Sequence, residues 1–130
     1  MNSAATFRVA FGRSSCPRPP LPNSPGRMPR VARQLALAHE IERRVRTGEF
    51  VDLAHAARAF GLTRARVTQI SNLTLLAPAI QADILAMPPI TAGRDTVTER
   101  TLRPIVAEPA WGRQVEVWNE PRYRGTLGVR

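Results

Sequence analysis

Side chains that can make paired hydrogen bonds to a planar partner are concentrated between positions 63 and 72 of the chain. An arginine guanidinium can donate two hydrogen bonds to O6 and N7 of guanine, and a glutamine amide can pair with N6 and N7 of adenine. Arg64 and Arg66 are therefore candidates for reading guanine, and Gln69 for reading adenine. The full set of candidate base-contacting residues is Thr63, Arg64, Ala65, Arg66, Thr68, Gln69 and Asn72.

The elements that would position these side chains are two short amphipathic helices on either side of Gly61. Apolar residues recur at helical spacing before the glycine and again after it: Leu53, Ala56, Ala57 and Phe60, then Leu62, Val67 and Ile70. Gly61 can adopt a positive φ without steric cost, and Thr63 offers a hydroxyl that can cap the second helix. The stretch 53–72 therefore predicts a helix-turn-helix, with Val67 and Ile70 buried and the polar set outside.

Further helices are predicted on both sides of this pair. Apolar steps of three and four run from residue 31 to about 47. Pro78 has the first-turn position of another helix, and Thr96 with Glu99 has the spacing of a capping box for a third. No strand alternation stands out, so the sequence predicts an all-α fold, a small helical domain built around the helix-turn-helix.

The composition divides the chain into three parts. Residues 1–30 hold six of the twelve prolines, five arginines and no acidic residue, which predicts a disordered Arg/Pro-rich tail. An organellar targeting segment and a start of translation at Met28 are alternatives for this part. We expect residues 31–107 to form the helix-turn-helix DNA-binding domain, and residues 108–130 to form an amphipathic helix and a second basic tail.

The charge of the chain favours a polyanionic partner. The net charge is +9, and all 19 basic residues are arginines. The sequence pI is about 11.7. Guanidinium forks match phosphates and guanine edges, so double-stranded DNA is the partner that the composition predicts.

Catalytic and cofactor chemistry find little support in the sequence. His39 and His55 lie far from Cys16 and form neither a metal-ligand set nor a nucleophile–base pair. We therefore expect no enzymatic activity and no bound metal or cofactor. No apolar run approaches the roughly 18 residues of a membrane span, and a single cysteine cannot form an intrachain disulfide. We expect a cytoplasmic, nucleoid-associated protein with no membrane contact.

Two segments, AHAARAFGLTRARVTQISNLTLLAPAIQADILAMP and VTERTLRPIV, resemble the helix-turn-helix domain of the ParB/KorB partition-protein family. The resemblance covers roughly residues 31 to 106 and implies binding of an operator-like duplex site as a homodimer. Its most specific matches are Gly61, Thr63, Arg64, Val67 and Gln69. The upstream region has no counterpart of the family's nucleotide-binding motif, so only DNA binding is implied. Free-standing modules of this kind look like small regulators or accessory proteins of mobile elements.

A protein-interaction module is the alternative from another functional class. Trp111, Val115 and Trp118 fall on one side of a predicted helix that begins near Pro109. This stripe would either pack against the domain or dock a larger protein partner. Phosphate binding weakens steeply with salt and apolar docking does not, so salt dependence separates the two functions.

Overall fold

The computed structural model describes residues 26–124, and within that range the secondary structure is helical. Its elements are α1 Arg30–Arg46, α2 Leu53–Phe60, α3 Arg64–Ser71, the 3₁₀ turn η1 Asn72–Leu75, α4 Pro78–Leu85, α5 Glu99–Val106, α6 Trp111–Trp118 and α7 Pro121–Arg124. Among the described residues the only β pairing is an isolated bridge between Arg27 and Ile90. The predicted all-α fold is confirmed.

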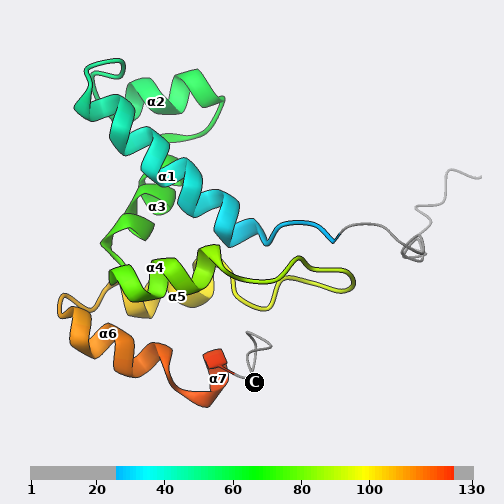
Figure 1. Cartoon of the computed structure of the whole chain (residues 1–130). Helices are drawn as coiled ribbons and strands as arrows, with labels where there is room; N and C mark the ends of the chain where they lie inside the picture. Colours follow the sequence, from blue (N-terminus) through cyan, green and yellow to red (C-terminus); the bar gives the residue numbers. More distant parts are fainter. Residues whose placement is uncertain (1–25, 125–130) are drawn as a thin grey trace, which may run out of the picture.

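The long helix α1 connects the two ends of the molecule. Figure 1 shows α2 beside the C-terminal half of α1 at one end, and α4 to α7 grouped at the other end, with α3 between them. Helix α3 packs on both α1 and α2, and η1 packs on α1 and α5. The position of α3 therefore depends on contacts from both ends.

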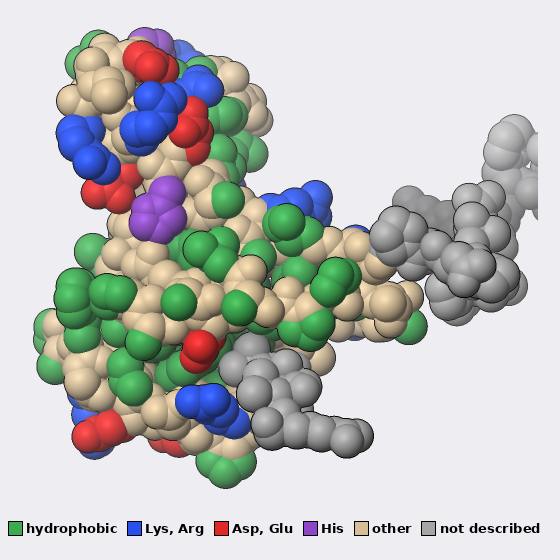
Figure 2. Space-filling view, viewed as in Figure 1, with side chains coloured by type: hydrophobic (Ala, Val, Ile, Leu, Met, Phe, Trp, Pro, Cys, Tyr) green, Lys and Arg blue, Asp and Glu red, His purple; other side chains and the backbone are tan. Residues whose placement is uncertain are grey.

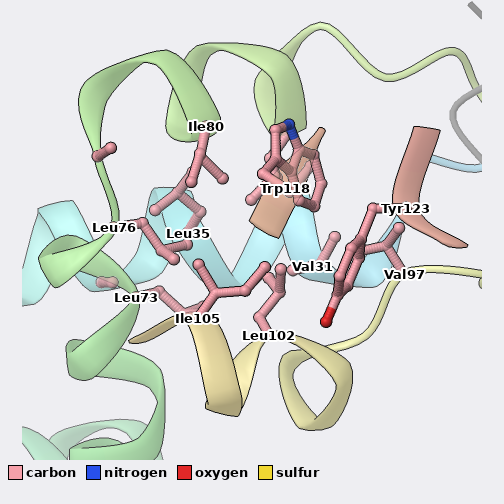
Figure 3. Packing of buried hydrophobic residues seen from close by; sticks show 14 of the residues in the cluster. Val31, Leu35, Leu73, Leu76, Ile80, Val97, Leu102, Ile105, Trp118 and Tyr123 are labelled. Atoms are coloured by element: carbon pink, nitrogen blue, oxygen red, sulfur yellow. The ribbon is translucent and has the colours of Figure 1, made fainter. Parts of the chain in front are cut away.

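Two hydrophobic clusters correspond to these two ends. The smaller one, here the α2 core, consists of Ile41, Phe50, Ala56, Ala57 and Val67. The larger one, here the main core, consists of Val31, Ala32, Leu35, Ala38, Ile70, Leu73, Leu76, Ala77, Ile80, Ile84, Val97, Leu102, Ile105, Trp118 and Tyr123 (Figure 3). Helices α1 and α3 each contribute to both clusters, because successive turns of an amphipathic helix can face different neighbours.

The end of the N-terminal tail differs from the sequence prediction. The Arg27 N–H donates to the Ile90 carbonyl at 3.0 Å, and the Ile90 N–H donates back to Arg27 at 2.8 Å. Helix α1 already begins at Arg30, whose N–H donates to Asp95 at 2.7 Å. Residues 26–30 are therefore part of the folded domain and not of the predicted tail, because Arg27 and Arg30 find partners in the loop before α5. Residues 1–25 of that tail lie outside the described part of the chain, as do residues 125–130 of the second basic tail.

The capping box of α5 is also shifted from its expected position. The hydroxyl of Thr98 accepts from the Thr101 N–H at 3.2 Å, and the Thr101 hydroxyl accepts from the Thr98 N–H at 2.9 Å. The prediction of a box from Thr96 to Glu99 is wrong, since Thr98 is the residue with extended backbone geometry at the helix start. Glu99 is thereby left free for a different contact, described below.

Candidate nucleic-acid interface

The turn between α2 and α3 is built from local hydrogen bonds. The Asp52 carboxylate caps α2 by accepting from the His55 N–H at 2.8 Å. At the other end Gly61 has a φ of 65°, and the Leu62 N–H donates to the Ala57 carbonyl at 2.9 Å. This hydrogen bond back across a glycine with positive φ is typical of a helix C-cap. It satisfies a carbonyl in the last turn of α2 and changes the direction of the chain.

Helix α3 starts at once after this turn and is held by its inner face. The Thr63 hydroxyl accepts from the Arg66 N–H at 3.1 Å, as an N-cap does. Val67 is fully buried in the α2 core, and Ile70 is 3% exposed in the main core. The predicted burial of Val67 and Ile70 is confirmed, and it fixes which side of α3 faces outward.

Four of the candidate base-contacting residues form one exposed side of α3 and η1, here the outer face: Arg64, Ala65, Thr68 and Asn72. Arg64, Thr68 and Asn72 follow one another at steps of four, so they lie one above the other along the helix. The Thr68 hydroxyl donates to the Arg64 carbonyl at 3.0 Å. The Arg64 guanidinium makes no hydrogen bond or ion pair with any of residues 26–124.

Arg66 and Gln69 lie on the flank of α3 that faces α5, and both are half-buried. Arg66 Nη1 donates to Gln69 Oε1 at 3.3 Å and lies 3.5 Å from Glu99 Oε2. Glu99 is only 8% exposed and also accepts two hydrogen bonds from Arg103, at 2.9 and 3.1 Å, which raise the pKa of the Arg103 guanidinium. The structure therefore divides these six candidates into an outer face, whose side chains make no hydrogen bond or ion pair with another element of residues 26–124, and a flank tied to α5.

Glu99 is a residue that the sequence did not single out for this site. The Glu99–Arg103 spacing of four residues is a visible signal for one of its ion pairs. Its contact with Arg66, 33 positions away, has no local signal, because it forms only when α3 and α5 pack.

A concave surface lined by arginines adjoins α3. This basic groove has a volume of about 530 Å³ and lies between the start of α1, the loop around Asp95 and the start of α5. Six guanidinium groups line it, from Arg27, Arg30, Arg33, Arg66, Arg94 and Arg100. Asp95 and Glu99 are the two carboxylates in the same lining, so the groove carries a clear positive excess.

Arginines at the opposite end of α1 have a different environment. Glu40 accepts hydrogen bonds from Arg43 at 2.9 Å and from Arg44 at 2.7 Å, and these bonds lower the pKa of Glu40 to about 2. Figure 2 shows acidic and basic side chains interspersed over this end of the molecule. The excess positive charge of the described chain is therefore not spread evenly, because here arginines and glutamates neutralise one another.

The tryptophan stripe expected near the C-terminus is divided between core and surface. Trp118 is 1% exposed, packs in the main core and donates through Nε1 to Asp83 at 2.8 Å. Trp111 is 56% exposed, and Val115 packs partly against the main core. A docking surface made of both tryptophans is therefore ruled out, because Trp118 faces inward.

Residues 26–124 contain no cluster of three His, Cys, Asp or Glu side chains with the geometry for a metal ion. Their two histidines have other partners: His39 Nε2 is 2.7 Å from Gln81 Oε1, and His55 Nδ1 accepts from the Val51 N–H at 3.3 Å. None of the helices in this range combines the length and the apolar character that crossing a bilayer requires. Comparison with protein-family models, curated proteins and solved structures found no match to this chain.

Proposed function

We propose that this chain binds double-stranded DNA sequence-specifically, with α3 in the major groove. The observation that supports this proposal most strongly is the outer face of α3. It presents Arg64, Thr68 and Asn72 to solvent in a row, while Val67 and Ile70 hold the helix from behind. An exposed row of hydrogen-bonding side chains on a short helix after a tight turn is the arrangement with which recognition helices contact base edges.

Within this proposal the outer face reads bases and the flank supports it. Arg64 is the guanine reader, because its guanidinium makes no hydrogen bond or ion pair within residues 26–124 that binding would have to break. Asn72 has the amide chemistry that pairs with adenine. Arg66 and Gln69 contribute less to base reading, because Arg66 already interacts with both Gln69 and Glu99. The N-terminus of α3 at Thr63 faces a phosphate, which fixes position without reading sequence.

The biological role that fits this chemistry is that of a small transcriptional regulator or a mobile-element accessory protein. It rests on the resemblance to ParB/KorB helix-turn-helix domains, which is a matter of sequence motif alone. The same resemblance favours a homodimer, whose two recognition helices would meet half-sites about 34 Å apart or a multiple of that distance. Cytoplasmic, nucleoid-associated localisation and recruitment by a larger protein follow as parts of this proposal.

The proposal predicts different effects for two exposed arginines. Arg64→Ala should weaken binding to a selected duplex and relax preference at one base pair, by about 1 to 3 kcal/mol of discrimination. Arg113→Ala, on α6, removes an arginine whose one ion pair within residues 26–124 is with Glu116, at 2.9 Å, and should leave binding unchanged. Fluorescence anisotropy with the selected duplex and a shuffled one measures both effects.

The same measurement over a salt series separates DNA binding from apolar docking. The logarithm of the association constant for the duplex should fall linearly with the logarithm of the salt concentration, because phosphate contacts release counterions. Salt-independent binding, or equal losses for Arg64→Ala and Arg113→Ala, would contradict the assignment of sequence reading to α3.

A further inference from the structure

We propose that the basic groove is a second DNA contact, which holds the phosphodiester backbone of one strand beside the site read by α3. This inference rests on the proposed DNA binding and assigns to it a surface outside α2 and α3. The groove is formed by the start of α1, the loop around Asp95 and the start of α5.

The arginines of the groove fall into two groups by their existing contacts. Arg27 forms an ion pair with Asp95 and donates to the Gly93 carbonyl at 3.2 Å, and Arg66 is held by Glu99 and Gln69. Arg30 belongs to the same engaged group, because its backbone N–H donates to Asp95 at 2.7 Å and its positive charge helps to lower the pKa of that carboxylate. By contrast, Arg33, Arg94 and Arg100 are exposed and make no hydrogen bond or ion pair within residues 26–124. Three guanidinium groups that line one concavity are therefore available to a ligand.

The two carboxylates of the groove are already engaged by the protein. Burial opposes ionisation of Asp95, yet the hydrogen bonds from the Arg30 N–H and the Arg27 guanidinium lower its pKa. Glu99 is occupied by Arg103 and Arg66. These carboxylates hold the walls of the groove in place, and they leave the outermost arginines uncompensated.

A ligand with several phosphates fits this arrangement better than a single anion. A guanidinium fork binds one phosphate through two parallel hydrogen bonds, so three free forks match a run of successive phosphates. The groove is also continuous with α3, because Arg66 belongs to both. If α3 lies in the major groove of the DNA, the phosphates of one flanking DNA strand can therefore lie along the basic groove of the protein. A free polyphosphate offers the same run of phosphates, so the experiment must distinguish it from the DNA backbone as the ligand of the groove.

The test uses the full-length chain and the triple variant Arg33→Ala, Arg94→Ala, Arg100→Ala. Its matched control, Arg46→Ala, Arg113→Ala, Arg124→Ala, removes the same net charge from exposed positions outside the groove. Binding of the selected and the shuffled duplex is measured across a salt series, with inorganic tripolyphosphate titrated separately. Far-UV circular dichroism and urea unfolding should show all three proteins folded, because the groove side chains lose no partner within residues 26–124 and the control arginines lose only exposed pairs with Glu42, Glu116 and Asn119.

The groove variant should lose affinity for both duplexes by the same factor, at least about tenfold, while its preference between them is kept. Its salt slope should fall by about 0.9 for each phosphate contact removed. The control should keep the wild-type slope. A groove variant with wild-type slope and affinity, or a control that loses as much, would overturn this inference and leave the reading role of α3 intact. Tripolyphosphate binding that needs the groove, combined with unchanged duplex binding, would overturn it as well. A wild-type chain that binds no duplex at all would instead refute the proposed function.

Discussion

The two ends of this molecule are stabilised in different ways. The α2–α3 pair is shaped by contacts over three to five residues: Asp52 caps His55, Leu62 pairs with Ala57, and Thr63 caps Arg66. Helices α4 to α7 are joined by contacts across tens of residues. Trp118 donates to Asp83 over 35 positions, and the Tyr123 hydroxyl donates to the Thr101 carbonyl over 22 positions. The turn that shapes the candidate interface is therefore determined by neighbouring residues, whereas the helices that support it depend on contacts between distant segments.

Gln114 is the clearest example of this distant support. It is 1% exposed, and its Oε1 accepts from the Ala77 N–H at 2.7 Å, capping α4 from a position 37 residues away. Its Nε2 donates to the Glu108 carbonyl at 2.8 Å. Since α4 has no side-chain cap of its own, the start of that helix depends on α6.

The largest expected effect comes from breaking the distant support. Trp118→Ala should destabilise the domain by about 3 to 5 kcal/mol, because it empties a filled site in the main core and leaves Asp83 without its donor. Trp111→Ala, at a 56% exposed position of the same helix, should change stability by less than about 0.5 kcal/mol. Urea unfolding gives both values. Similar losses for the two tryptophans would mean that α6 does not anchor the main core.

A smaller effect is expected from the local turn. Gly61 has a φ of 65°, and an added Cβ would meet nothing within 4 Å, so Gly61→Ala should cost only the left-handed backbone penalty of about 1 to 2 kcal/mol. Gly112 lies inside α6 with equally open space around it and no positive φ. Gly112→Ala should therefore stabilise the protein, by about 1 kcal/mol. A neutral or stabilising Gly61→Ala in thermal unfolding would show that the turn does not require glycine.

The smallest expected effect is a loss of folding stability at acidic pH, when the carboxylates of Glu40 and Asp95 become protonated. Hydrogen bonds from Arg43 and Arg44 lower the pKa of Glu40 from 4.5 to about 2, and those from Arg30 and Arg27 hold the pKa of Asp95 below its ordinary value despite partial burial. Both carboxylates have depressed values in the folded state, so their stabilisation is complete above the unfolded pKa and disappears as the pH falls toward the folded one. Carboxyl titration followed by NMR measures both values. If either carboxyl group titrates with its ordinary pKa, its ion pair does not stabilise the folded protein.

The local part of the fold could be predicted from the sequence. Helix α1 was expected over residues 31–47 and spans Arg30–Arg46. The turn at Gly61, the cap at Thr63 and the burial of Val67 are also as predicted, because each depends on neighbours within a few positions.

The remaining features depend on packing between distant segments. Thr96 and Thr98 both have a possible capping partner three residues later, and only the packed chain selects Thr98. The ion pair of Arg66 with Glu99 joins two helices that are far apart in the sequence. The basic groove likewise brings together residues near positions 30, 66 and 95. No spacing rule within one helix links these positions, so the groove could not be predicted from periodicity.

The most direct test of the central claim is selection of bound duplexes from a random pool at physiological salt, with the wild-type chain and Arg64→Ala in parallel. The wild-type chain should enrich one motif, and a homodimer should enrich it as an inverted repeat with half-sites about 34 Å apart. Arg64→Ala should lose the preference at one base pair of each half-site. Failure of the wild-type chain to enrich any motif, or an unchanged motif with Arg64→Ala, would contradict sequence reading by the outer face of α3.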